Sequence, residues 1–542
     1  MTTEFETRAD YVVIGGGSAG AVVASRLAEQ AGTSVILVEA GGSGRSPFLM
    51  LPGAMTFVKD WSRHAWLYAT EPDPSRGGRV DTWKRGRSLG GSSSINGLIW
   101  ARGLPRDFDS WAALGATGWG WDGVRDSFMK AEQALGFDAA ERGQQGPVWV
   151  ETFRSPHPLS RDLLEAFGQA GFPIVADINQ ARSSAAAITQ TNQRGGIRQS
   201  TETAYLRKRL PGLRILQRTR AQRLLIAGGR AVGAELRRDD GSELRIGANC
   251  EVIVCAGAIE SPALLLRSGI GPADPLRALS IAPVVDAPEV GMNMQDHPDL
   301  YVEYAVSQPT YSDAGRWFRM PGIGLQFLLR RSGPATSPGT HVFAYGSSQR
   351  RLDDPDLLFF TGPFGQIVEG AFTGRQSMYS VTPSICRPHS RGRVWLADRS
   401  PDVAPRIQPN LLGDERDLAL IVDAIGWVDE IVGKAPFADS LRGRVRPRAA
   451  LRASDRAELE AFARAAVATC HHSCGTCRMG SDERSVVDPS LKVRGLAGLR
   501  VADASVFPQI TSGNLNAPVI MVGERAADLI RQERRSVARP KP

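Results

Sequence analysis

Cysteine is scarce in this sequence, and it lacks long apolar runs. Six cysteines in 542 residues are too few for a disulfide framework, which favours a reduced, cytoplasmic protein. No apolar run approaches the roughly 18 residues that a membrane-spanning helix needs. The N-terminal residues include acidic side chains and lack the basic and apolar regions of a secretory signal. We therefore expect neither a transmembrane segment nor a secretory signal.

Concentrated positive charge is also missing. The net charge is +8 and the isoelectric point is near 9.3, but the arginines are spread along the whole chain, with no basic stripe between aromatic residues. We expect a compact protein that does not bind nucleic acid. The chain is longer than one hydrophobic core usually supports, which predicts two structural domains.

A glycine-rich turn follows the first predicted strand. The buried-strand pattern of residues 11–14 breaks at residues 15–20, and helical spacing follows. Gly15 permits a tight turn, Gly17 lets the backbone approach a pyrophosphate, and Gly20 lets the helix pack on the strand. The free amides at the helix N-terminus favour an anion. The predicted phosphate cradle comprises Gly15, Gly17, Ser18, Ala19 and Gly20.

The second predicted strand supports a dinucleotide ligand. It leads into Glu39, about 20 residues after Gly20, where a carboxylate can accept hydrogen bonds from an adenosine ribose. This favours FAD or NAD over NADP, and we expect the adjacent Ala40 to contact the cofactor as well. The alternative is a tight turn that packs well and binds nothing.

A second loop rich in glycine and hydroxyl groups spans residues 86–97. Its glycines allow close backbone approach, and its hydroxyls can donate hydrogen bonds to a second face of a pyrophosphate or to a flavin edge. The alternative is an ordinary polar loop. The predicted cofactor contacts in this loop are Arg87, Gly91, Ser92, Asn96 and Gly97.

Several segments resemble signatures of the glucose–methanol–choline (GMC) oxidoreductase family. Residues 86–97 resemble the first signature and residues 257–271 the second. Residues 471–480 and 512–518 complete a resemblance that extends over residues 10–530. It implies an α/β (α+β) fold of two domains. One is a Rossmann-like FAD-binding domain, and the other is a substrate domain built on an antiparallel sheet.

The resemblance also implies domains that are discontinuous in sequence. The FAD-binding domain is expected to combine residues 1–157, 194–299 and 463–542. The substrate-binding domain is then expected to comprise residues 158–193 and 300–462.

Two features of the second domain bear on its sheet and its pocket. Residues 379–412 alternate between apolar and polar residues, which predicts antiparallel strands of the substrate-domain sheet. Five aromatic residues are candidates for the wall of an alcohol pocket or, equally, for ordinary core: Phe343, Tyr345, Phe359, Phe360 and Phe364.

The activity that the resemblance implies is FAD-dependent oxidation of a primary alcohol to an aldehyde. A base removes the hydroxyl proton as hydride passes to flavin N5, because an alkoxide releases hydride more readily than an alcohol does. Histidine suits this role because its pKa lies near neutrality. His472 matches the family's catalytic histidine, and we choose it over His471. Asn514 matches the second catalytic position, where an amide hydrogen-bonds the substrate oxygen. The other histidines are interpreted as structural: His64, His157, His297, His341 and His389.

The resemblance implies further contacts with the flavin. Asp503 and Ala504 are expected against the isoalloxazine ring, and Ala221 in a loop that contacts the adenine. Asn516 begins a helix whose N-terminus would stabilise negative charge on the reduced ring; the alternative is simple capping. Some family members link the flavin covalently to a histidine of the first signature. Ile95 stands at that place here, so we expect noncovalent FAD.

Two other functions compete with this interpretation. Cys470, Cys474 and Cys477 beside two histidines resemble part of a zinc or redox site, but no second Cys-x-x-Cys accompanies them, and we predict no metal. A GMC-fold flavoprotein without alcohol oxidation, such as a carbon–carbon lyase or a photodecarboxylase, is the other alternative. The expected substrate is a small alcohol. No residue decides between oxygen and a quinone-type carrier as electron acceptor, and none indicates the oligomeric state.

Overall fold

Strand β1 (Thr7–Ile14) lies inside a seven-stranded sheet, as its apolar residues predict. It runs parallel to β2 (Val35–Val38) and to β15 (Glu243–Val254). The sheet order is β12-β2-β1-β15-β14-β13, with β27 beside β15. Its other strands are β12 (Leu213–Leu216), β13 (Thr219–Ala227), β14 (Arg230–Arg238) and β27 (Leu499–Val501). The structure is a computed structural model that describes residues 5–58, 60–314, 320–349, 353–365, 376–452 and 454–538.

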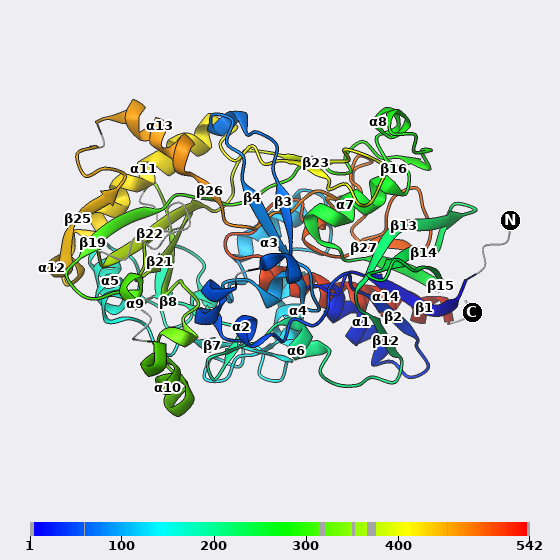
Figure 1. Ribbon diagram of the computed structural model, residues 1–542, viewed down its shortest axis with the longest axis horizontal. Helices are drawn as coiled ribbons and strands as arrows, with labels where there is room; N and C mark the ends of the chain where they lie inside the picture. The colour runs from blue at the N-terminus through cyan, green and yellow to red at the C-terminus, as the bar shows by residue number, and fades with distance from the viewer. Residues whose placement is uncertain are drawn as a thin grey trace.

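Helices from opposite ends of the chain pack together beside this sheet (Figure 1). They are α1 (Gly20–Ala28) and α14 (Asn516–Ala538). Gly523 of α14 allows the close approach, because a Cβ there would lie 3.0 Å from the Cβ of Val22. The glycine turn that precedes α1 therefore lies next to the start of α14.

The second sheet has eight strands, and every pairing in it is antiparallel. Buried apolar side chains of α5 (Pro158–Gln169), α11 (Glu415–Val432) and α13 (Arg456–Ala466) share its core. The strand order is β25-β19-β22-β21-β20-β8, with β18 paired to β22 and β26. The strands are β8 (Ala185–Ile188), β18 (Pro298–Asp299), β19 (Val302–Val306), β20 (Val342–Gly346), β21 (Leu357–Gly362), β22 (Met378–Ile385), β25 (Leu441–Arg446) and β26 (Ala468–Thr469).

These two sheets confirm the predicted α/β two-domain fold, with a mainly parallel sheet and an antiparallel one. Figure 1 shows them on opposite sides of the molecule, with the hairpin of β3 (Ala65–Ala69) and β4 (Thr82–Gly86) between them. Within the described ranges, no helix is long and apolar enough to cross a membrane.

The boundary between the two domains lies close to the second sheet. The division that we predict at residue 463 would fall inside α13, whose Leu459 and Ala463 share one core. The short strands β18 and β26 belong to the second sheet, although both lie in stretches that we assign to the FAD-binding domain. We propose that the second domain ends after α13, with β18 and β26 joining the two domains.

Only part of segment 379–412 behaves as expected. Strand β22 joins the antiparallel sheet, whereas β23 (Arg393–Trp395) and β24 (Arg406–Gln408) pair with each other. Val394 of β23 and Ile407 of β24 pack in a separate core with Tyr68, Ile259 and other residues. Burial of these apolar side chains stabilises the β23–β24 pair outside the antiparallel sheet.

The remaining strands are two residues long each, whereas several of the remaining helices contribute buried side chains to the first core. The remaining strands are β5 (Glu132–Gln133), β6 (Val148–Trp149), β7 (Glu151–Thr152), β9 (Gln190–Thr191), β10 (Gln193–Arg194), β11 (Ile197–Arg198), β16 (Ile270–Gly271) and β17 (Val285–Asp286). The remaining helices are α2 (Pro47–Met50), α3 (Pro105–Ala113), α4 (Trp121–Ala131), α6 (Thr201–Tyr205), α7 (Gly257–Arg267), α8 (Ala273–Ala278), α9 (Tyr311–Ala314), α10 (Met320–Arg330) and α12 (Phe437–Ser440).

Gly426 in the middle of α11 offers a test of the fold's local energetics. It is exposed, and a Cβ there would meet no atom within 4 Å. Because glycine in a helix interior costs about 0.5–1 kcal/mol relative to alanine, Gly426→Ala is expected to raise the free energy of unfolding by that amount. Denaturant unfolding, where it is reversible, measures this difference; a destabilised variant would show that α11 is strained at this position.

Candidate active site

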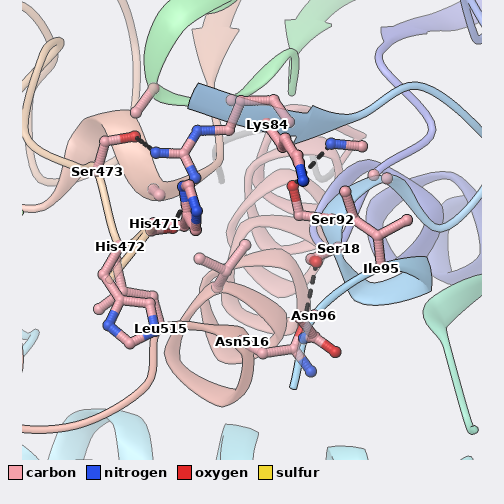
Figure 2. A pocket seen from close by; sticks show the side chains of 18 of the residues that line it. Ser18, Lys84, Ser92, Ile95, Asn96, His471, His472, Ser473, Leu515 and Asn516 are labelled. Carbon is pink, nitrogen blue, oxygen red and sulfur yellow. Dashed lines mark hydrogen bonds between the residues drawn. The ribbon is translucent and has the colours of Figure 1, made fainter. Parts of the chain in front are cut away.

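A cavity of about 600 Å³ is bordered by residues from both ends of the chain. Figure 2 shows Ser18 and Asn516 joined by a hydrogen bond on one side of it, with His471, His472 and Ser473 on another. Sixteen of the eighteen predicted site residues line it: Gly15, Gly17, Ser18, Ala19, Glu39, Ala40, Gly91, Ser92, Asn96, Gly97, Ala221, His472, Asp503, Ala504, Asn514 and Asn516. Gly20 and Arg87 do not line it.

The glycine turn has geometry that only glycine allows. Gly15 has φ +102°, and a Cβ there would lie 2.4 Å from the carbonyl oxygen of Cys255. A Cβ at Gly20 would lie 1.8 Å from the carbonyl oxygen of Gly15, so this residue serves the packing of α1 rather than the cavity wall. A Cβ at Gly91 would lie 2.6 Å from the Cα of Gly17. The two glycine loops therefore touch, and they form one backbone surface at the cavity.

Glu39 ties the end of β2 to the glycine turn. One carboxylate oxygen accepts a hydrogen bond from the backbone N–H of Gly16 and the other from that of Gly41, both at 2.8 Å. Burial raises the pKa of Glu39 to about 7, although these hydrogen bonds oppose the shift. Each oxygen keeps a second lone pair, so Glu39 can also accept a hydrogen bond from a ligand in the cavity.

Arg87 lies away from the wall because its side chain packs elsewhere. Its guanidinium stands 4.7 Å from the ring centre of Trp66, a residue that does line the cavity. Arg85 borders the cavity instead. It donates a 2.6 Å hydrogen bond to the carbonyl oxygen of His471 and another to the hydroxyl of Ser473. The arginine of this region that reaches the C-terminal loop is thus Arg85.

Other predicted contacts have partners within the protein. Asp503 accepts hydrogen bonds from the N–H of Gly257 and the hydroxyl of Ser261, so its carboxylate joins α7 to the C-terminal segment. The side-chain oxygen of Asn96 accepts a 2.7 Å hydrogen bond from the buried Arg198. Both residues border the cavity while they hold neighbouring loops in place.

Several buried polar atoms of wall residues have no hydrogen-bond partner among the described residues. They include Nδ2 of Asn516 and Oδ1 of Asn514. A buried polar atom without a partner costs free energy, so such atoms indicate a ligand with matching donors and acceptors. The start of α14 also presents its positive dipole end at this wall. A flavin ring has such polar edges, and the glycine surface suits a pyrophosphate, so the residues fit FAD.

His472 lies at the other side of the cavity with a partner at each ring nitrogen. Its Nε2 is 3.1 Å from the side-chain nitrogen of Asn514, and its Nδ1 is 2.8 Å from Nδ1 of His297. Burial, and then the nearby His297, Arg85 and His471, lower the pKa of His472 well below its usual value. The structure therefore brings His472 and Asn514 together and keeps the imidazole uncharged at neutral pH.

Two loops hold this pair in position. The backbone N–H of His472 donates a 2.7 Å hydrogen bond to Asp296, and that of Cys470 donates one of 3.0 Å to the carbonyl of His297. On the other side, buried Asp107 accepts hydrogen bonds from both the N–H and the hydroxyl of Ser512, at 2.7 and 2.8 Å. No pattern in the sequence indicates this role for Asp107. From the sequence His297 is interpreted as structural, and only the pairing of its segment with the histidine loop shows that it contacts His472.

The cysteines of the C-terminal loop are unpaired. Cys474 and Cys477 are fully buried within the first core, and burial raises the pKa of both thiols well above the usual value. The sulfur of Cys470 lies 3.8 Å from Nε2 of His472. Among the residues that the structure describes, no group of three or more His, Cys, Asp or Glu side chains is placed to hold a metal ion.

The five aromatic candidates divide between wall and core. Phe360 and Phe364 line the cavity, together with Asp299, Tyr301 and others. Phe343, Tyr345 and Phe359 are fully buried in the cores of the second sheet instead. Phe360 and Phe364 therefore provide apolar wall on the substrate-domain side.

Comparisons with known proteins agree with this geometry. A family model described as GMC oxidoreductase matches residues 9–299 in its N-terminal part and residues 388–523 in its C-terminal part. An oxygen-dependent choline dehydrogenase of Rhizobium johnstonii is 37% identical over 529 residues, which cover 96% of this chain and 95% of that protein. Another of Brucella suis is also 37% identical over 529 residues, with the same coverage.

Solved structures give the same result. The crystal structure of pyridoxine 4-oxidase from Mesorbium loti superimposes with a TM-score of 0.86 at 30% identity, covering 97% of this chain and 99% of that one. A formate oxidase of Aspergillus oryzae superimposes with a TM-score of 0.90 at 25% identity, covering 99% of this chain and all of that one.

Proposed function

The chain belongs to the GMC oxidoreductase family, and on this premise we propose that it oxidises a small primary alcohol to an aldehyde, with His472 as the base. The protein is an FAD-dependent oxidoreductase, and alcohol oxidation is its function. The single observation that carries the proposal is the uncharged His472 beside Asn514 on the cavity wall, with Nε2 and the amide nitrogen 3.1 Å apart.

The two side chains divide the work on the hydroxyl group. Nε2 of His472 accepts the hydroxyl proton, because a neutral imidazole has a free lone pair. Without substrate the amide of Asn514 donates to Nε2 of His472. When the alcohol is bound, its hydroxyl would take that lone pair, and the amide would donate to the substrate oxygen as negative charge develops on it. FAD, when bound, supplies the acceptor for the hydride that leaves the carbon. Phe360 and Phe364 would give the substrate side an apolar wall.

We propose the following cofactor-binding roles for the predicted residues on the wall. Gly15, Gly17 and Gly91, with Ser18, Ala19 and Ser92 beside them, would hold the pyrophosphate, and Glu39 the adenosine ribose. Ala40 and Ala221 would border the adenosine end, and Gly97 the flavin-side loop with Asn96. Asp503, Ala504 and Asn516 would border the isoalloxazine ring. Ile95 on the same wall has no nucleophilic atom, which supports noncovalent FAD.

The pH dependence of flavin reduction is a test of the base. Because the pKa of His472 lies well below its usual 6.5, its neutral form persists as the pH falls toward and below that value. With saturating alcohol, the anaerobic rate of flavin reduction is therefore expected to stay level from about pH 8 to about pH 6 and to fall only at lower pH. The test uses an uncharged alcohol, because Asp299 lies on the same wall and burial raises its pKa to about 7. A change in the charge of Asp299 would otherwise affect a charged alcohol in the same pH range. A decline centred at or above 6.5 would contradict the assignment.

The relatives support a small alcohol as substrate and oxygen as acceptor. Their names include choline, pyridoxine, "oxygen-dependent" and "oxidase", and none of the relatives named above is called a lyase or a decarboxylase. The six unpaired cysteines support a cytoplasmic location. Anaerobic mixing of the purified protein with a panel of alcohols should bleach the flavin, and air should restore its colour quickly. If no alcohol bleaches it, the proposed substrate class is wrong; if air restores it slowly, another acceptor is used.

A further inference from the structure

His297 is the fully buried partner of His472. The rings stand at 88° to each other with their centres 5.1 Å apart, and their Nδ1 atoms are separated by 2.8 Å. On its other side, Nε2 of His297 lies 3.1 Å from the carbonyl oxygen of Cys386. Both nitrogens of His297 therefore have polar partners, and these partners determine where the protons lie.

The carbonyl fixes the proton on His297. A carbonyl oxygen accepts hydrogen bonds and cannot donate one, so Nε2 of His297 carries a hydrogen. Burial lowers the pKa of His297 to about 4, although the carbonyls of Cys386 and Thr511 oppose the shift, so the ring holds a single proton at neutral pH. Nδ1 of His297 is then a bare acceptor. The hydrogen between the two rings must come from Nδ1 of His472.

The same assignment of protons identifies the basic nitrogen of His472. This ring is also neutral, so a hydrogen on Nδ1 leaves a lone pair on Nε2, the nitrogen that faces Asn514. Asn514 must then present its NH₂ group to that lone pair, which fixes the orientation of the amide. Both contacts of His472 are satisfied by one arrangement of protons.

We propose that His297 is a positioning residue that holds the proton of His472 on Nδ1 and thereby leaves Nε2 as the atom that accepts the hydroxyl proton. The inference rests on the proposed function, because the choice of nitrogen matters only if His472 is the base. When the O–H bond breaks, its proton goes to Nε2, and the Nδ1 hydrogen stays between the two rings. The positive charge on His472 is then stabilised by the bare nitrogen of His297.

A second imidazole differs from the carboxylate that orients many catalytic histidines. A carboxylate at Nδ1 would favour the imidazolium and raise its pKa. The nearby carboxylate of Asp296 does not take this place, because it accepts hydrogen bonds from the backbone N–H of His472 and from the hydroxyl of Thr469. His297 thus selects the tautomer without adding a charge that would keep the base protonated.

The direct test is the tautomer of His472 in the FAD-loaded wild-type enzyme. The chain has seven histidines, so ¹⁵N-histidine labelling gives few ring signals, and His472→Ala identifies the one that disappears. We expect long-range ¹H–¹⁵N spectra at neutral pH to show a protonated Nδ1 and a bare Nε2. A protonated Nε2 with a bare Nδ1 would overturn the proposal, whatever the activity of the enzyme.

Two variants of similar size separate positioning from a general structural role. In His297→Asn, the shorter side chain can place its amide oxygen near the hydrogen on Nδ1 of His472. In His297→Gln, the amide lies nearer the carbonyl of Cys386 and offers His472 no acceptor. Only the glutamine variant is expected to lose the tautomer preference and to slow flavin reduction by ~10-fold or more, with little change in alcohol binding.

The outcomes distinguish this inference from the function on which it rests. If the glutamine variant keeps a bare Nε2 and the wild-type reduction rate, His297 does not position the base. If the wild-type enzyme shows the expected tautomer but no alcohol reduces its flavin, the tautomer is supported and the proposed function fails.

Discussion

Replacement of His472 by alanine is expected to slow flavin reduction by at least ~10²-fold while the protein keeps its FAD. The substitution removes the lone pair that accepts the hydroxyl proton, whereas the glycine surface and the start of α14 at the cofactor end of the cavity stay intact. Stopped-flow absorbance under anaerobic conditions measures the rate, and the flavin absorbance of the purified variant measures cofactor content. Undiminished reduction would remove His472 from the mechanism.

Two other histidines serve as controls. His389 is exposed and does not line the cavity, so His389→Ala should reduce its flavin at the wild-type rate. His471 adjoins His472 and contacts Arg85 through its backbone carbonyl, which alanine keeps. His471→Ala is therefore expected to have a much smaller effect than His472→Ala. If the two effects were exchanged, His471 would be the base.

Gly91→Ala is expected to lower FAD affinity by about 10- to 10²-fold. Gly91 has φ +51°, and its added Cβ would lie 2.6 Å from the Cα of Gly17, so the two glycine loops would have to separate. Strain of about 1–3 kcal/mol at such a position corresponds to this loss in affinity. Titration of the apoprotein with FAD, followed by flavin fluorescence, measures it.

Gly77→Ala is the matched control for this substitution. Gly77 has a similar φ of +66°, but a Cβ there would meet no atom within 4 Å, and the residue does not line the cavity. It therefore shares the backbone strain and lacks the clash with Gly17. Equal loss of FAD in the two variants would mean that contact between the glycine loops does not matter for binding.

The features that the sequence predicts well are those with local causes. The turn at Gly15 and Gly20 follows from backbone geometry that only glycine permits, and β1 and α1 follow from their own apolar patterns. The prediction of an antiparallel second sheet rested on a family resemblance that extends over most of the chain. In these cases nearby residues, or a family signature, contain the information.

The features that the sequence did not predict depend on contacts between distant segments. Arg85 rather than Arg87 reaches the histidine loop, because Arg87 stacks on Trp66. His297 looked like a packing residue and proved to contact His472, 175 positions away, through the pairing of β18 with β26. Two-residue strands leave no periodic signal, so only the folded chain shows that they join these histidines.

Isotopic substitution of the alcohol tests the central claim most directly. The measurement compares the anaerobic rates of flavin bleaching by a primary alcohol that carries deuterium on the hydroxyl-bearing carbon and by its unlabelled form. Because that carbon–hydrogen bond breaks in the oxidation, the deuterated alcohol is expected to bleach the flavin several-fold more slowly, with the aldehyde as product. Bleaching without aldehyde formation, and at equal rates for the two alcohols, would contradict alcohol oxidation at this site.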